Sequence, residues 1–217
     1  MNKPFSLRQW MKRHPEYWYL LFIPGYIICF FIMEHLVPAD CDYWVSYCAL
    51  DDHIPFLEGF VIPYCLWYPF LFVTGMGLLL KDVPEMKRYV WFMIAGFGFS
   101  MLFCVLFPNG QDLRPLPFDH ENFCTRLLGG IYAADTNTNV IPSMHIIGCV
   151  AACIAVFRSA PLRHWRLPIL IVAIAISLST VFVKQHSILD IFAGLAVCIP
   201  LWFIFYFRKP RSSMKQK

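Results

Sequence analysis

Apolar residues fall into long runs along this chain, and polar residues gather in the segments between the runs. Each run is close to the ~20 residues that cross about 30 Å of hydrocarbon at 1.5 Å per residue. The pattern predicts six membrane-spanning helices, at about 17–33, 62–80, 89–107, 141–157, 167–183 and 188–207. Because no internal repeat or second domain interrupts this pattern, residues 1–217 form one predicted domain, an all-α bundle of six transmembrane helices.

Composition supports a membrane protein. Hydrophobic residues make up 59% of the chain and charged residues 15%, against roughly 25% charged residues in soluble domains. The first run follows basic residues, as in a signal peptide, but it is too long, too aromatic and lacks a small-residue cleavage site, so we expect a permanent span. The net charge of +4 sits at span ends rather than on one face, so no nucleic-acid partner is expected.

The distribution of Lys and Arg predicts the orientation of the spans. Positive charge gathers in the N-terminus, in the second connection around Lys87, in the fourth around Arg163, and in the tail around Lys215. The first and third connections are rich in Asp and Glu. We therefore expect both termini in the cytoplasm and the first and third connections on the extracytoplasmic side, in a plasma (inner) membrane.

Two connections are long enough to form structure of their own. The first contains "DDHIPFLEGF" (51–60), which suits an interfacial segment lying along the membrane surface. The connection 108–140 carries enough apolar residues to be ordered, and a short surface helix is expected near 124–132. Of nine cysteines, six lie in apolar runs; Cys41, Cys48 and Cys124 lie in these connections, and their pairing is left open.

The seam between the last two runs, "VKQHSILD", places Lys184, His186 and Asp190 in an apolar setting. His186 and Asp190 are four residues apart, so on a helix they would share a face. An unpaired carboxylate inside a membrane costs several kcal/mol, and the imidazole N–H is the nearest partner. Such a pair fixes the histidine tautomer and frees the other nitrogen to act as nucleophile or base, although it could equally be a structural bridge.

A second polar cluster, "NVIPSMH", opens the fourth span. Pro142 is expected in the first helical turn, with Ser143 and His145 just after it. Free backbone N–H groups and the helix dipole make a helix start an anion site. The predicted topology brings six candidate residues to one membrane face, where they suit a phosphate and acid–base chemistry: Arg114, Ser143, His145, Lys184, His186 and Asp190.

Other chemistry fits the sequence less well. "DTNTNV" (135–140) begins like a calcium loop, but Val140 stands at the glycine position and Ile146 at the position of the bidentate glutamate. We expect a polar turn instead, with Asp135 or Asn139 near the site. Haem held by the two histidines would leave the serine, lysine and aspartate beside them unexplained. No ligand spacing indicates a metal, and no cofactor is expected.

These motifs resemble a known family. "RP" (114–115), "IPSMH" (141–145) and "STVFVKQHSILD" (179–190) are similar to the three signature motifs of the type 2 phosphatidic acid phosphatase superfamily. That superfamily also includes sphingomyelin-synthase-like phosphotransferases. The resemblance covers about the last half of the chain, and the six-span plan fits the rest.

The resemblance implies a role for each matching residue. His186 would attack phosphorus to form a phosphohistidine, and Asp190 would orient its ring. His145 would protonate the leaving oxygen and then activate the acceptor, while Ser143 and Arg114 would hold phosphate oxygens.

Two positions depart from the family pattern. Phe107 stands where the first motif has a lysine, and Thr180 where the last motif has an arginine. Lys184 is a candidate replacement for one of these two cations. The function expected from the resemblance is a lipid-phosphate phosphatase that acts at the extracytoplasmic face. The alternatives are a lipid phosphotransferase with an alcohol acceptor and a non-enzymatic lipid-binding or transport protein; oligomeric state is left open.

Overall fold

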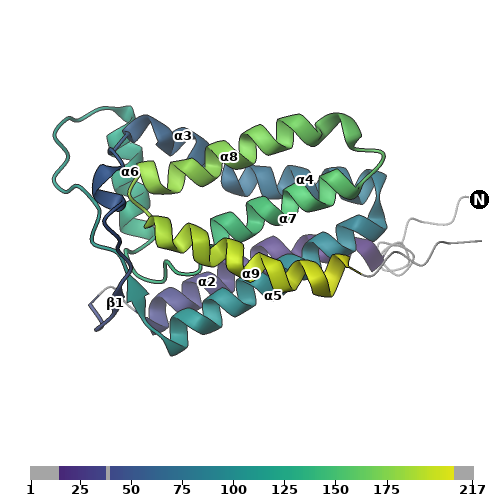
Figure 1. Cartoon of the computed structure of the whole chain (residues 1–217), viewed down its shortest axis with the longest axis horizontal. Coiled ribbons are helices and arrows are strands. Elements are labelled where there is room, and N and C mark those ends of the chain that lie inside the picture. The colour runs from purple at the N-terminus through teal and green to yellow at the C-terminus, as the bar shows by residue number, and fades with distance from the viewer. Residues whose placement is uncertain (1–14, 38–39, 208–217) are drawn as a thin grey trace, which may run out of the picture.

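The computed structural model describes residues 15–37 and 40–207, so the basic N-terminus and the tail around Lys215 lie outside the described residues. Within these ranges the chain forms a helical bundle, as predicted (Figure 1). The α-helices are α2 (Phe22–Leu36), α3 (Val61–Cys65), α4 (Trp67–Lys81), α5 (Val83–Leu106), α6 (Phe123–Ala134), α7 (Met144–Arg158), α8 (Arg166–Phe182) and α9 (Ile188–Tyr206). The connections contain the 3-10 helices η1 (Pro15–Leu21), η2 (Asp51–His53), η3 (Glu58–Phe60) and η4 (Arg163–Trp165) and the strands β1 (Trp44–Val45) and β2 (Asn109–Gly110).

Five helical segments of the described ranges are long and apolar enough to cross a membrane. They correspond to five of the predicted spans: Pro15–Leu36, Glu58–Lys81, Val83–Leu106, Arg163–Phe182 and Ile188–Tyr206. The remaining prediction, 141–157, corresponds to α7, which has 15 residues. At 1.5 Å per residue α7 is about 22 Å long, shorter than the hydrocarbon layer. Helix length therefore supports five of the predicted spans, and the sixth stays a prediction.

α7 is enclosed by other helices. It packs against α4, α5, α8 and α9, and nine of its 15 residues are buried. Several of these are small, such as Gly148, Ala151 and Ala152, which lets neighbouring backbones approach closely. α7 therefore forms the centre of the bundle.

The connections alternate between the two ends of the bundle (Figure 1). β1, α3 and α6 gather at one end, where α8 also passes into α9, and the α4–α5 and α7–α8 turns lie at the other end. The acid-rich and basic connections are thus separated along the bundle. Which end faces the cytoplasm stays a prediction.

The turn between α4 and α5 is shorter than expected. Asp82 alone separates Lys81 from Val83, and its carboxylate accepts a hydrogen bond of 3.3 Å from the backbone N–H of Glu85. This side-chain cap starts α5 six residues before the predicted span. Lys87 therefore lies in α5, and its expected place in the connection is wrong.

Polar contacts join helices at the end of the bundle where the α4–α5 turn lies. Ser159 Oγ donates a hydrogen bond of 2.8 Å to Asp82 Oδ2. The Glu85 carboxylate pairs with Arg88 and lies 3.6 Å from Arg158 Nε. These contacts join the start of α5 to the end of α7.

The first and third connections pack together at the opposite end. β1 pairs with β2 in parallel, and α6 covers the helix predicted near 124–132. A small apolar cluster joins α6 to α3 and to the end of α8: Val61, Tyr64, Leu128, Tyr132 and Val183. The long third connection is therefore ordered, as predicted, while its depth in the membrane stays untested. All nine cysteines are free thiols.

Candidate active site

The predicted pair of His186 and Asp190 is present, but its geometry differs from the expected shared helix face. α9 begins at Ile188, so His186 precedes the helix. Asp190 Oδ2 lies 3.0 Å from His186 Nδ1 and also accepts the backbone N–H of Ser187 at 3.0 Å. The carboxylate thus caps its own helix and holds the imidazole with the same oxygen.

The other oxygen of Asp190 has a partner that the sequence did not indicate. Ser46 Oγ, next to β1, donates to Asp190 Oδ1 at 2.5 Å. Both side chains are completely buried. Asp190 is therefore held on both oxygens, which leaves it little freedom to rotate away from His186.

Asp51 braces the start of α9 from the first connection. Its carboxylate accepts from Ser187 Oγ at 2.6 Å and from the backbone N–H of Ile188 at 2.9 Å. A buried carboxylate at a helix start also interacts favourably with the helix dipole. At least one acidic residue of the first connection, Asp51, thus stabilises the start of α9.

Ser143 brings the start of α7 against α9. It is the N-cap of α7, so Pro142 precedes the helix and does not occupy its first turn as expected. The Ser143 backbone N–H donates to the Asp190 carbonyl at 3.2 Å, and a Cβ on Gly194 would lie 2.9 Å from the Ser143 carbonyl oxygen. This close approach explains how two distant motifs meet.

The two candidate histidines face each other. Their ring centroids are 5.4 Å apart at an angle of 71°, and Ser143 Oγ lies 3.5 Å from His186 Nε2. The His145 ring packs against Trp67 at 4.3 Å and Tyr64 at 4.8 Å. The α3–α4 segment thus sets the orientation of His145, a role that the apolar run did not reveal.

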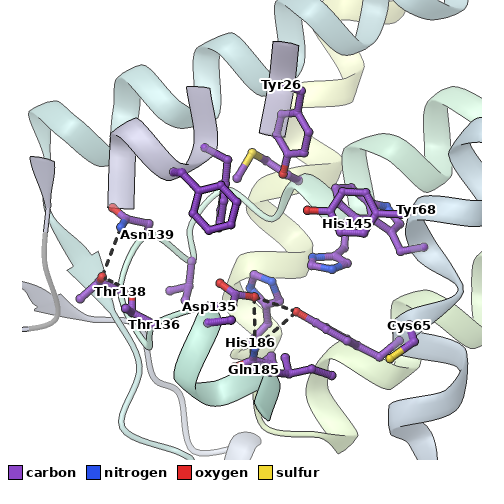
Figure 2. Close-up of a pocket in the computed structure, with 18 residues that line it drawn as sticks. Tyr26, Cys65, Tyr68, Asp135, Thr136, Thr138, Asn139, His145, Gln185 and His186 are labelled. Carbon is purple, nitrogen blue, oxygen red and sulfur yellow. Dashed lines mark hydrogen bonds between the residues drawn. The ribbon is translucent and has the colours of Figure 1, made fainter. Parts of the chain in front are cut away.

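Both histidines line a cavity of about 340 Å³ at this end of the bundle. Figure 2 shows their rings pointing into the same space. Aromatic and polar side chains make much of the rest of the wall: Tyr26, Tyr64, Trp67, Tyr68, Asp135 and Gln185. Among the described residues that line it there is no lysine or arginine.

Asp135 lines the cavity, as expected for a residue near the site. Its Oδ2 accepts from Tyr64 Oη at 3.1 Å and from Gln185 Nε2 at 3.2 Å. Burial raises the pKa of the Asp135 carboxyl to about 6, and the nearby charge of Glu34 acts in the same direction. Burial therefore makes the Asp135 carboxyl a weaker acid than a solvent-exposed aspartate.

Asn139 also lines the cavity, but its side-chain amide nitrogen holds the loop. It adopts a left-handed backbone conformation, φ 61°, which asparagine tolerates better than most residues. Its Nδ2 donates to Glu34 Oε1 at 2.8 Å and to the Val37 carbonyl at 3.2 Å, while Thr136 Oγ1 donates to the same carboxylate. α2 is thereby tied to the turn that carries Asp135.

Arg114 does not line the cavity, contrary to the role expected from the resemblance. Its guanidinium donates to the carbonyl oxygens of Tyr132, Asp135 and Thr136 and to Gln185 Oε1, and it stacks 4.4 Å from the Tyr132 ring centroid. Burial lowers the pKa of Arg114. Arg114 organises the turn behind the cavity, where it supports Asp135 and Gln185.

Lys184 likewise points away from the cavity, so it does not replace a missing phosphate-binding cation in this structure. Its ammonium donates to the carbonyls of Asp51 and Ile54 at 2.9 and 2.6 Å, and burial lowers its pKa. Its backbone is left-handed, φ 53°. Thr180, the second departure from the family pattern, is buried, and its carbonyl accepts the backbone N–H of His186.

Comparison with known proteins found no family model that matches the chain and no match among curated proteins or solved structures. Within residues 15–37 and 40–207, no group of three or more His, Cys, Asp or Glu side chains could hold a metal ion. The site is thus described by its geometry alone: a carboxylate-held imidazole, a second imidazole beside it, a buried serine hydroxyl within hydrogen-bond distance of the first imidazole, and a helix start. This arrangement can support nucleophilic attack followed by proton transfer.

Proposed function

We propose that the chain is an integral membrane enzyme that removes phosphate from a lipid phosphate through a phosphohistidine at His186. The observation that carries the proposal is the 3.0 Å contact between His186 Nδ1 and Asp190 Oδ2. It leaves Nε2 of a cavity-lining ring as the reactive nitrogen, with His145 beside it. The resemblance in the three motifs agrees with this assignment.

Two half-reactions follow from this arrangement. His186 Nε2 attacks phosphorus, the bond from phosphorus to the lipid oxygen breaks, and His145 gives a proton to that oxygen. Water then gives a proton to His145 while its oxygen attacks phosphorus, and the phosphorus–nitrogen bond breaks to release phosphate. Asp190 compensates the positive charge on the His186 ring in the phosphoenzyme.

The phosphate oxygens would be held without arginine or lysine. Ser143 is buried beside the cavity; its Oγ makes no cap hydrogen bond within α7 and lies 3.5 Å from His186 Nε2, so it would have to turn from that ring to donate to a phosphate oxygen. The first backbone N–H groups of α7 and the helix dipole add to the attraction. Arg114 acts as a positioning residue in this proposal, through the turn that it holds.

A second candidate function is transfer of the phosphoryl or phospho-headgroup to an alcohol. The cavity volume of about 340 Å³ is in the range of ~300–1,000 Å³ typical of small-molecule sites. Its walls include Phe30 and Phe31 as well as tyrosines. Such walls suit an organic head group or acceptor in addition to phosphate. A third candidate, a lipid binder without catalysis, would use the same cavity.

The proposed topology places α7 as a sixth span that completes the bundle. Both termini would lie in the cytoplasm, and the cavity would open on the extracytoplasmic side of a plasma (inner) membrane. The separation of acid-rich and basic connections between the bundle ends supports this orientation.

One assay separates the three candidates. Purified protein in detergent is given phosphatidic acid or an isoprenyl pyrophosphate, with and without an alcohol acceptor, and inorganic phosphate is measured. A phosphatase releases phosphate, a transferase releases little and phosphorylates the alcohol, and a binder does neither. Turnover should persist in EDTA and be inhibited by orthovanadate, which mimics five-coordinate phosphorus; loss in EDTA that magnesium restores would contradict the mechanism.

A further inference from the structure

The turn between α8 and α9 carries the candidate nucleophile in a strained piece of backbone. Its backbone N–H groups attach it to α8: those of Gln185 and His186 both donate to the Thr180 carbonyl at 3.0 Å. Lys184, in the same turn, is left-handed, with φ 53°. Residues other than glycine adopt this conformation rarely, and it persists where surrounding contacts hold it. The conformation therefore directs attention to the side-chain contacts of the turn.

The Lys184 side chain attaches this turn to the first connection. Its ammonium donates to the carbonyls of Asp51 and Ile54, at η2 and directly after it, at 2.9 and 2.6 Å. Lys184 is only 9% exposed, so these carbonyls take the place of water around a buried cation. The turn that carries His186 thus holds the backbone of η2.

Asp51 makes the reverse attachment, from η2 to the start of α9. Its Oδ2 accepts from Ser187 Oγ at 2.6 Å and from the Cys48 backbone N–H at 2.9 Å, and its Oδ1 accepts from the Ile188 backbone N–H at 2.9 Å. The residue is 2% exposed, so loss of these donors would leave a buried charge without partners. η2 and the α8–α9 turn therefore hold each other.

Ser187 connects the Asp51 contact to the candidate nucleophile. It follows His186 directly in the chain, and its hydroxyl donates to Asp51. Its backbone N–H donates to Asp190 Oδ2 at 3.0 Å, the same oxygen that lies 3.0 Å from His186 Nδ1. A shift of Ser187 would thus move the backbone of His186 and disturb the carboxylate that holds its ring.

We infer that Asp51 and Lys184 form a clasp that fixes the His186 ring against Asp190, so that both are positioning residues for the nucleophile. The inference rests on the proposed function for the reaction that the clasp serves. Neither clasp residue is among the described residues that line the cavity, so the clasp acts through the turn and not on the substrate. The first connection thereby becomes part of the active-site machinery.

The kinetic test alters each clasp residue in the full chain. It measures kcat and KM with whichever of phosphatidic acid and an isoprenyl pyrophosphate the unaltered protein cleaves. Asp51→Asn loses one acceptor oxygen and the charge, and Lys184→Met keeps the aliphatic stem without the ammonium. Each should lower kcat roughly 10- to 100-fold and leave KM within about threefold, and Lys184→Arg should keep most of the rate.

Two further comparisons separate a clasp from unrelated effects. Because each residue holds the segment that carries the other, the double variant should lose little more kcat than the worse single variant. The matched controls are Asp52→Asn and Lys87→Met, both exposed, and they should keep kcat. Additive losses in the double variant would contradict a single device.

A spectroscopic measurement tests the clasp without turnover. In protein with isotope-labelled histidine, the proton on His186 Nδ1, assigned by its absence from His186→Ala, reports the hydrogen bond to Asp190 in magnetic resonance spectra. The resonance should shift in Asp51→Asn and Lys184→Met and stay in place in both controls. If Asp51→Asn does not fold, Lys184→Met and Lys184→Arg carry the same comparison.

The outcomes distinguish the clasp from the proposed function. The inference is overturned, and the proposed function stands, if either kcat or the His186 resonance is unchanged in both single variants. A lower Tm with kcat unchanged would likewise show that the contacts are only structural. A protein that cleaves neither lipid overturns the proposed function, and a resonance unchanged in both variants would then overturn the clasp as well.

Discussion

Ser46 Oγ donates a hydrogen bond of 2.5 Å to Asp190 Oδ1, across 144 positions of sequence. The bond connects the first connection of the chain to the carboxylate that holds His186. Because Asp190 is completely buried, no solvent can replace the serine hydroxyl without rearrangement. The orientation of the candidate nucleophile thus depends on a residue outside all three family-like motifs.

Ser46→Ala should lower kcat by roughly 10- to 100-fold, since a hydrogen bond to a charged group contributes about 1.5–3 kcal/mol. The pH profile of kcat should shift, because Asp190 is then free to turn from the His186 ring, and Ser46→Thr should restore most of the rate. Ser177→Ala is the control, because Ser177 Oγ donates to the Ala173 carbonyl of its own helix rather than to Asp190. An unshifted pH profile in Ser46→Ala would show that the bond is only structural.

The two histidines should fail at different steps. With a nitrophenyl phosphate, whose leaving group needs little protonation, His145→Ala should still form a phosphoenzyme and then stall. His186→Ala should form none, and both should lose about 10²-fold or more in steady-state rate. If the His186→Ala protein still acquired an acid-labile, base-stable phosphoryl label, His186 would not be the nucleophile.

Gly194→Ala should destabilise the protein by about 1–3 kcal/mol, because its Cβ would lie 2.9 Å from the Ser143 carbonyl oxygen. The added methyl group would push α9 from the start of α7, so activity should fall with Tm. Gly98→Ala is a matched control, since a Cβ there meets nothing within 4 Å. Thermal unfolding in detergent measures the Tm of both variants, and equal Tm values would refute the close approach of Gly194 to Ser143.

The pH dependence of activity should include a contribution from Asp135, whose carboxyl pKa is raised to about 6. Above pH 6 the carboxylate is ionised and repels the anionic phosphate of the substrate; below it the group is neutral and this repulsion is lost. Arg114, Glu34 and His186 share its surroundings, so the measurement is the ratio of kcat/KM for the unaltered protein to kcat/KM for Asp135→Asn, which should fall as pH rises through about 6. A ratio that does not change with pH would show that this carboxyl does not act on the substrate.

Orientation can be measured by cysteine labelling in a cysteine-free background. Asp119 and Arg163 are both exposed and lie in connections at opposite ends of the bundle. An impermeant reagent should label Asp119→Cys from outside intact cells, and Arg163→Cys only after permeabilisation. The reverse result would place the cavity on the cytoplasmic side.

Hydropathy and local spacing predicted the features that depend on residues close together in the sequence. Helix α9 begins at the predicted residue, and the pair of His186 and Asp190 forms. The start of α5 was missed, although Asp82, followed three residues later by Glu85, carries a recognisable cap signal. Apolar runs locate the buried part of a helix and say little of where its first turn begins.

Long-range polar contacts could not be predicted from spacing. Ser46 and Asp51 reach α9 from more than 130 positions away, and nothing near them in sequence names their partners. The cationic character of Arg114 and Lys184 suggested phosphate binding, yet both are occupied by backbone carbonyls. Charge identifies what a side chain can bind, and only the fold decides which acceptor lies within its reach.

The contacts of Asp82 and Glu85 with Ser159 and Arg158 fasten α5 to α7 at the end of the bundle far from the cavity. At its other end α7 meets α9 through the hydrogen bond from the Ser143 backbone N–H to the Asp190 carbonyl, so a tilt of α7 about the fastened end would be felt there. Over the 15 residues of α7, about 22 Å, a tilt of about 5° about that fastening displaces the opposite tip by about 2 Å. Ser143 and His145 sit at that tip, so slight rocking of one helix would widen or narrow the gap between the two imidazoles.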